Sequence, residues 1–132
     1  MPTGRCHCGK IRYAIESERI YAAVCHCEDC RRSSGAIAVG WSAYPAAGLT
    51  VTGGKPREYA SSEHGRRQFC GDCGTGLFYY NDEVLPGLVD IQLTTFDDPE
   101  NHEPQIHVQT GDELPWEAGL GELPRFERYP EP

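Results

Sequence analysis

Apolar and polar residues alternate over residues 10–16 (KIRYAIE), which places Ile11, Tyr13 and Ile15 on one face. This period of two is typical of a half-buried β-strand. Similar short stretches follow along the chain, rich in β-branched and aromatic residues and separated by Gly, Ser and Pro. The further strands that they predict cover residues 20–24, 36–44, 49–52, 57–60, 66–69, 76–80, 87–95 and 105–109.

Helical periodicity is weak by comparison. No window carries an apolar stripe at helical spacing over three turns, and only residues 27–33 favour a short helical turn. The 15 glycines and 10 prolines of this 132-residue chain favour turns over long helices. We therefore predict a mostly-β fold with short helices or none.

The length of the chain allows one domain with one core, which we expect to span residues 1–132. From about residue 111 the composition shifts to Pro, Gly and Glu. Large apolar residues nevertheless recur in this stretch, at Trp116, Leu120, Leu123 and Phe126. We therefore expect an irregular tail that packs back onto the domain.

Charge is unevenly distributed along the chain. The formal net charge is −8, but residues 1–67 hold ten Lys/Arg against six Asp/Glu, and residues 68–132 hold two against fourteen. This balance excludes a general nucleic-acid binder, although the first half can still form a local cationic pocket. No apolar run reaches the roughly 18–20 residues of a membrane span, and MPTGRCHCGK contains no apolar signal core. We expect a cytoplasmic protein without membrane partners, either a monomer or a homodimer.

Cysteine is the unusual residue of this sequence. Seven cysteines form three clusters, at residues 6–8 (CHC), 25–30 (CHCEDC) and 70–73 (CGDC). An odd number without an export signal fits metal ligation better than a disulfide framework. A CxxC turn presents two sulfurs to one ion, and a glycine directly after the second cysteine of a cluster, as at Gly9 and Gly74, eases the tight turn. The clusters therefore predict zinc binding.

The spacing leaves two partitions of the cysteines open. One pairs the two CxxC turns, Cys27 and Cys30 with Cys70 and Cys73. The other closes a four-sulfur site from residues 6–8 and 70–73 and leaves three ligands on the segment 25–30. Three protein ligands with an open position are typical of a reactive zinc site.

The sequence resembles the glutathione-dependent formaldehyde-activating enzyme family, which includes centromere protein V. Three segments carry the resemblance and occur in this order: GRCHCGKIRY, CHCEDCRRSSG and FCGDCGTGLF. The resemblance extends over roughly Gly4 to Phe126. It implies a zinc-containing β-tent of antiparallel sheets. It also implies the second partition, with Cys6, Cys8, Cys70 and Cys73 as ligands of a structural zinc and Cys25, Cys27 and Cys30 as the reactive site.

The activity that this resemblance implies is a carbon–sulfur lyase reaction, which joins a small aldehyde such as formaldehyde to a thiol such as glutathione, or separates them. A zinc ion with a vacant position can lower the pKa of an incoming thiol. Three thiolates leave Zn²⁺ with a net charge of −1, so we favour activation of the thiol over polarisation of the aldehyde.

Glutathione carries two carboxylates, which arginine can bind in a bidentate manner. The arginines next to the cysteine clusters are therefore candidate substrate ligands. The alternative functions are a non-catalytic zinc-binding module and a redox sensor in which the three-cysteine site loses its metal and oxidises. The candidate arginines are Arg31, Arg32, Arg66 and Arg67.

Overall fold

A computed structural model describes residues 1–130 and confirms the mostly-β class. The described chain contains ten strands, one α-helix of seven residues, α1 (Glu28–Ser34), and five short 3-10 helices. The strands are β1 (Thr3–Arg5), β2 (Arg12–Ile15), β3 (Tyr21–Cys25), β4 (Val39–Pro45), β5 (Leu49–Gly53), β6 (Arg57–Ala60), β7 (Gly65–Phe69), β8 (Gly76–Asn81), β9 (Leu88–Gln92) and β10 (Ile106–Val108). The 3-10 helices are η1 (Ala46–Gly48), η2 (Leu93–Thr95), η3 (Pro99–Asn101), η4 (Thr110–Asp112) and η5 (Glu117–Glu122).

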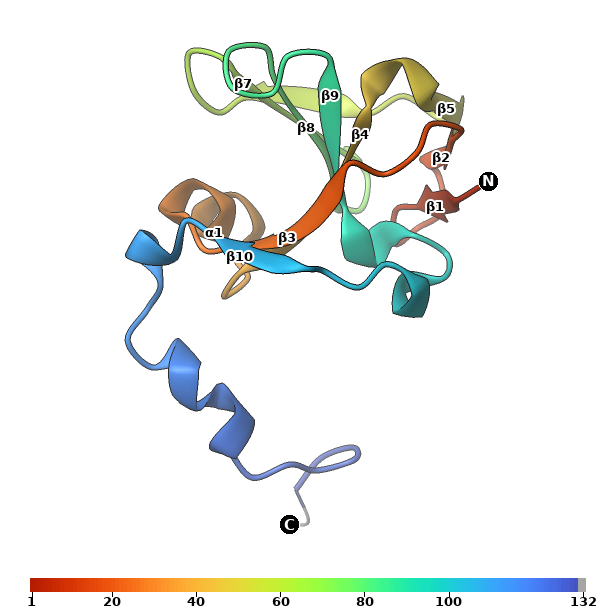
Figure 1. Ribbon diagram of the computed structural model, residues 1–132. Helices are drawn as coiled ribbons and strands as arrows, with labels where there is room; N and C mark the ends of the chain where they lie inside the picture. The colour runs from red at the N-terminus through yellow and green to blue at the C-terminus, as the bar shows by residue number, and fades with distance from the viewer. Residues whose placement is uncertain (131–132) are drawn as a thin grey trace.

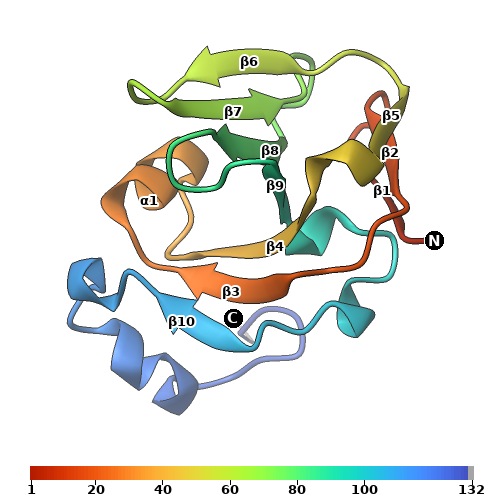
Figure 2. The ribbon, with the colours of Figure 1, turned by 45° about the horizontal axis from the view of Figure 1, so that its top comes forward.

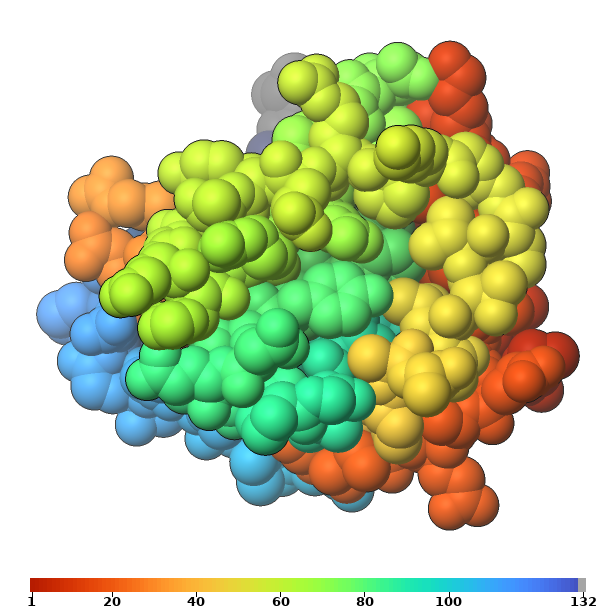
Figure 3. Space-filling view, turned by 90° about the horizontal axis from the view of Figure 1, so that it is seen from above, coloured from red at the N-terminus to blue at the C-terminus, as the bar shows by residue number. Residues whose placement is uncertain are grey.

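The strands form two sheets (Figures 1 and 2). The smaller has the order β1-β2-β5, and the larger has the order β10-β3-β4-β9-β8-β7-β6. All pairs are antiparallel except β10, which lies parallel to β3 at one edge. At the opposite edge all four residues of β6 are exposed, and the hairpin of β6 and β7 lies on the surface seen in Figure 3.

Strand β9 shows how the larger sheet separates two apolar clusters. Its Val89 and Ile91 are fully buried in the main core, where they join Phe78 from the neighbouring strand β8 and Tyr13 from the smaller sheet. Because alternate side chains of a strand point to opposite faces, Asp90 points to the other side of the sheet. That side carries a second cluster, made by Cys25, Cys30, Val39 and Trp41 with Cys27, Tyr79 and Val108 packed against it.

The expected strands match the observed ones closely, with three differences. Strand β1 was not predicted, because three residues are too few to show a period. The strand predicted at 36–44 begins only at Val39, because the turn after α1 occupies the first positions. The strand predicted at 87–95 ends at Gln92, where the Thr95 hydroxyl donates a 2.7 Å hydrogen bond to the Gln92 carbonyl and closes a 3-10 turn instead.

The segment after β10 leads away from the sheet (Figure 1). Trp116, Leu120, Leu123 and Phe126, which we expected to pack onto the domain, are 54%, 38%, 58% and 57% exposed. Glu117 is different, because its side chain is only 5% exposed. Among the residues described, no helix is long and apolar enough to cross a membrane.

Candidate functional site

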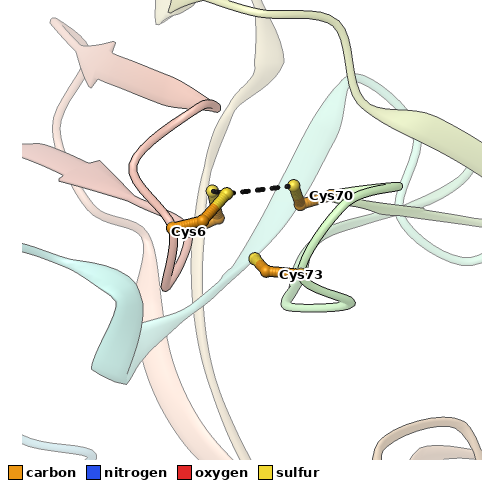
Figure 4. Close-up of side chains that lie close together, drawn as sticks. Cys6, Cys70 and Cys73 are labelled. Carbon is orange, nitrogen blue, oxygen red and sulfur yellow. Dashed lines mark hydrogen bonds between the residues drawn. The ribbon is translucent and has the colours of Figure 1, made fainter.

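Two similar turns bring four cysteines together. The backbone N–H of Gly9 donates to the Cys6 carbonyl, and that of Gly74 donates to the Cys70 carbonyl. Both glycines have positive φ, 81° and 82°, a conformation that residues with a Cβ rarely adopt. The glycines predicted to ease these turns therefore do so. Figure 4 shows Cys6 from the loop between β1 and β2 facing Cys70 and Cys73 from the loop after β7.

The sulfurs of this four-cysteine cluster fit a zinc ion. Four sulfurs placed about 2.3 Å from a tetrahedral zinc lie roughly 3.8 Å from one another. Here Cys6 Sγ lies 3.6 Å from Cys8 Sγ, which lies 3.8 Å from Cys70 Sγ, and all four sulfurs are within 4.8 Å of one another. Contacts with Thr75 lower the pKa of the Cys73 thiol to about 5, which favours the thiolate that a metal needs.

The remaining three cysteines also meet, with sulfurs within 4.8 Å of one another. Cys25 ends β3, and Cys27 is the N-cap of α1, where its sulfur accepts a 3.3 Å hydrogen bond from the backbone N–H of Cys30. The short helix thus turns the chain back so that its own first turn completes the cluster. The structure therefore groups the cysteines as the family resemblance implied and does not pair the two CxxC turns with each other.

Within this three-cysteine cluster Cys30 is the group that ionises first. A hydrogen bond from the Cys25 thiol, with further contacts from Cys27 and Arg67, lowers the pKa of Cys30 to about 5 although burial opposes it. The pKa of Cys25 is raised, chiefly by its contact with Cys30, and burial raises that of Cys27. One negative charge is thus concentrated on Cys30. Among the described residues, Arg67 is the one arginine whose side chain reaches this sulfur.

The structure separates the four candidate arginines. Nη2 of Arg67 lies 3.8 Å from Cys30 Sγ, and its guanidinium carbon lies 4.7 Å from the centre of the Tyr79 ring. The guanidinium groups of Arg66, Arg31 and Arg32 donate to other protein groups, and Arg32 also lines a cavity beside Cys30. Arg66 donates to the carbonyls of its own hairpin, Arg31 to the Asp112 carbonyl at 2.7 Å, and Arg32 to the Glu28 carboxylate at 2.8 Å.

Two cavities meet at the three-cysteine cluster. Cys30, Trp41 and Arg67 line both of them. The first, which we call the arginine cavity, has a volume of about 580 Å³ and is also lined by Arg32 and Arg57. The second, which we call the aspartate cavity, has a volume of about 530 Å³ and is also lined by Cys25, Cys27, Asp29, Tyr21, Tyr79 and Asp90.

His26, between two of the cysteines, points away from their sulfurs. Its Nδ1 lies 2.8 Å from Glu117 Oε1, and its Nε2 lies 2.9 Å from His107 Nδ1. Glu117 also accepts a 2.6 Å hydrogen bond from the Leu114 backbone, which, with His26, lowers the pKa of its carboxyl. The segment after β10 is thereby attached to the loop that carries Cys25 and Cys27.

Two polar residues of the cavities were missed by sequence reasoning. Arg57 reaches the arginine cavity from the edge strand β6, where it pairs with Phe69 of β7, and nothing in its local sequence distinguishes it. Asp90 did leave a signal, because it is the single acidic residue in the apolar stretch LVDIQ. An acid at a buried strand position needs an explanation.

Comparisons with known proteins agree with this arrangement. The sequence profile of the family described as "Glutathione-dependent formaldehyde-activating enzyme" matches residues 1–112. A curated protein of Schizosaccharomyces pombe, described as an uncharacterised lyase, is 36% identical over 78 residues, which are 58% of this chain and 55% of the relative. The chain thus spans about half the length of that relative.

A solved structure has a similar fold. The crystal structure of a Rhodobacter sphaeroides protein superposes with a TM-score of 0.66, over 80% of this chain and 99% of that one. The two sequences are 20% identical, so this likeness concerns the fold alone.

Proposed function

Because the chain belongs to the glutathione-dependent formaldehyde-activating enzyme family, we propose that it is a zinc-dependent carbon–sulfur lyase that adds a small aldehyde to a thiol such as glutathione, or removes it. The observation that carries this proposal is the position of the three-cysteine cluster at the junction of two cavities. Smaller cavities of about 410 and 280 Å³ border Cys6 and Cys70, but four sulfurs leave a tetrahedral ion no open position for a substrate.

The cysteines divide into ligands for two different ions. Cys6, Cys8, Cys70 and Cys73 would hold a structural zinc, since four sulfurs complete its coordination. Cys25, Cys27 and Cys30 would hold a second zinc, and three sulfurs are one fewer than a closed site has. When bound there, zinc supplies a charge that stabilises the thiolate form of an incoming thiol at neutral pH.

The residues of this chain would orient the thiol. Arg67 lies at the junction beside Cys30, and its planar guanidinium is held against Tyr79. Arg57 and Arg32 line the arginine cavity against one acid, Glu58. A carboxylate of the substrate would therefore enter the arginine cavity, with Arg67 near the reacting sulfur.

The reaction balances without an oxidant or reductant. In the addition, the thiol loses its proton and its sulfur forms a bond to the aldehyde carbon. The carbonyl π electrons move to oxygen, which takes up a proton and becomes a hydroxyl. In the cleavage direction the hydroxyl loses its proton, the carbonyl reforms, and the carbon–sulfur electron pair returns to sulfur. Trp41 and Val39 form apolar walls near this position, which limit the water around a small aldehyde.

Magnetisation-exchange NMR with isotopically labelled formaldehyde and glutathione tests the proposal directly. Zinc-loaded protein should accelerate the exchange between free aldehyde and hydroxymethyl adduct above the rate without protein, and Cys27→Ser should lose this acceleration while remaining folded. If the wild type with two zinc ions leaves the exchange rate unchanged, the chain is a non-catalytic zinc module instead. A reversible loss of the second zinc on mild oxidation would then favour the redox-sensing alternative.

A further inference from the structure

Asp90 occupies an unusual position on the cavity side of the larger sheet. In the register of the strands it lies between Ala43 on β4 and Tyr79 on β8. The same row continues to Tyr21 on β3 and to Arg67 on β7. Side chains of one row share one face of a sheet, so the carboxylate lies among two tyrosines and one arginine, and it lines the aspartate cavity.

Within the described residues the Asp90 carboxylate has no protein partner. Its side chain belongs to a residue that is 8% exposed, and its Oδ1 is buried with no hydrogen bond within residues 1–130. Across the same part of the chain, no lysine, arginine or histidine forms a salt bridge with it. Buried carboxylates are ordinarily paired, because burying an unpaired charge is costly. A donor that enters the cavity is therefore the natural partner.

The two cavities differ in charge, and this difference identifies the donor. Apart from the shared Arg67, the arginine cavity is lined by two cations and one anion, whereas the aspartate cavity is lined by two anions, Asp29 and Asp90, and no cation. An anionic substituent is thus disfavoured in the aspartate cavity, and a protonated amine is favoured.

We propose that Asp90 binds the ammonium group of the substrate, so that the preferred thiol carries a protonated amine on the side of the aspartate cavity and a carboxylate on the side of the arginine cavity. This inference rests on the proposed function in one respect, because it places the thiol at the three-cysteine cluster between the two cavities. Because the arginine cavity is cationic and the aspartate cavity is anionic, the site would prefer zwitterionic thiols to simple thiols and to purely anionic ones.

The orphaned Arg67 Nε supports the same polarity. This N–H is buried and finds no acceptor within the described residues, although Nη2 of the same guanidinium is near Cys30. Arg67 and Asp90 are therefore a cation and an anion that share one wall, separated by Tyr79, and neither satisfies the other. A ligand that carries both a hydrogen-bond acceptor and a hydrogen-bond donor would satisfy Arg67 and Asp90 together.

Titration calorimetry with four probes tests the inference. The probes are glutathione, N-acetylglutathione, S-methylglutathione and N-acetyl-S-methylglutathione, each added to zinc-loaded wild type and to Asp90→Asn. Acetylation removes the ammonium group and leaves the carboxylates in place. We expect the wild type to bind each free amine at least about tenfold more tightly than its acetylated counterpart, which corresponds to about 1.4 kcal/mol. In Asp90→Asn this ratio should fall to near one.

The S-methyl probes separate this inference from the proposed function, because they have no reactive thiol. If the amine preference is lost in Asp90→Asn but the protein does not accelerate aldehyde exchange, the ammonium site stands and the lyase proposal fails. If the amine preference is absent from the wild type, or persists in Asp90→Asn, the ammonium site is refuted whatever the activity. Asp82→Asn, which removes an exposed acid outside both cavities, is the matched control and should keep the preference. Melting curves confirm that both variants are folded.

Discussion

The guanidinium of Arg67 lies 3.8 Å from the sulfur of Cys30, although the two residues are 37 positions apart. This contact joins β7 to α1 at the junction of the two cavities. It also distinguishes Arg67 from Arg66, the preceding residue, which points to the opposite face of β7 and donates to carbonyls of its own hairpin. Two adjacent arginines of equal charge thus have opposite relations to the candidate active site.

Arg67→Gln should weaken the binding of glutathione to the zinc-loaded protein. A direct charge-assisted contact contributes about 1.5–3 kcal/mol, which corresponds to a loss of affinity of roughly 10- to 150-fold. Arg66→Gln removes the same charge from the same strand and should change affinity less than about twofold, through the surface potential alone. Calorimetry at low ionic strength measures both. Equal effects of the two substitutions would show that Arg67 acts only at long range.

Cys70→Ser should destabilise the whole protein. Cys70 is 1% exposed and lies at the edge of the main core, and its cluster joins the loop after β1 to the loop after β7. Structural zinc contributes several kcal/mol of folding free energy in small domains, so the melting temperature and the zinc content should both fall. Thermal melts with metal analysis check this. A variant with an unchanged melting temperature and full zinc content would contradict a structural role.

Cys27→Ser should remove one zinc ion and leave the protein folded. The three-cysteine cluster lies on a segment of six residues, so it crosslinks little of the chain. We expect mass spectrometry under native conditions to show one zinc where the wild type has two, with an almost unchanged far-UV circular dichroism spectrum. A globally unfolded Cys27→Ser would argue that the three-cysteine cluster also supports the fold.

Asp90→Asn should stabilise the protein at alkaline pH. Burial, with the charge on Cys30, raises the pKa of Asp90 from 3.8 to about 6. The folded protein therefore binds this proton more tightly than the unfolded chain, so stability falls as the pH rises from about 4 to about 6 and stays lower above that range. A shift of this size corresponds to about 3 kcal/mol, on an order-of-magnitude basis.

Urea unfolding of wild type and Asp90→Asn at about pH 4 and about pH 8 measures this effect. We subtract the free energy of unfolding of the wild type from that of Asp90→Asn at each pH. This difference should be about 1–3 kcal/mol larger at pH 8 than at pH 4. Cys30, whose pKa is lowered to about 5, also faces this cavity and titrates in the same range, but it is present in both proteins, so the difference between them reports the contribution of Asp90 and its coupling to Cys30. A difference between the two proteins that does not depend on pH would assign the effect to packing.

Glu117→Ala should loosen the loop of Cys25 and Cys27 without unfolding the sheet. The Glu117 and His26 side chains are each 5% exposed and lie 2.8 Å apart, so their contact attaches the last 3-10 helix to this loop. Hydrogen–deuterium exchange should increase at residues 26–28 and remain unchanged in β8 and β9. Glu122→Ala alters an exposed residue of the same helix and serves as the control. Equal exchange in both variants would show that the contact does not restrain the loop.

The sequence was sufficient for those features that have a local cause. Alternation predicted most strands, and Gly9 and Gly74 marked the two cysteine turns. The short helical turn predicted over residues 27–33 corresponds to the helix at Glu28–Ser34. Each of these features depends on residues that are near one another in the chain.

Features that depend on strand order could not be read from the sequence. Strand β10 lies parallel to β3, and Arg57 reaches a cavity from the opposite edge of the sheet. Both positions depend on pairings between segments that are distant in the sequence. Likewise, nothing in the local sequence shows that Arg31 is occupied by the Asp112 carbonyl, 81 positions away. Asp90 was visible as an acid in an apolar strand, but its partnerless environment is a property of the folded sheet.

The contact between Glu117 and His26 has a consequence for biosynthesis. The ribosome releases the chain from its N-terminus, so the last ligand of the four-cysteine cluster, Cys73, emerges well before β10 and Glu117. A nascent chain can therefore close its scaffold while β3 is still an unpaired edge and the loop of Cys25 and Cys27 is unsupported. The sulfurs of the three-cysteine cluster gain this support only after residues 106–117 have emerged, and a chain that is cut short between residues 96 and 106 would have the main core and the four-cysteine cluster without it.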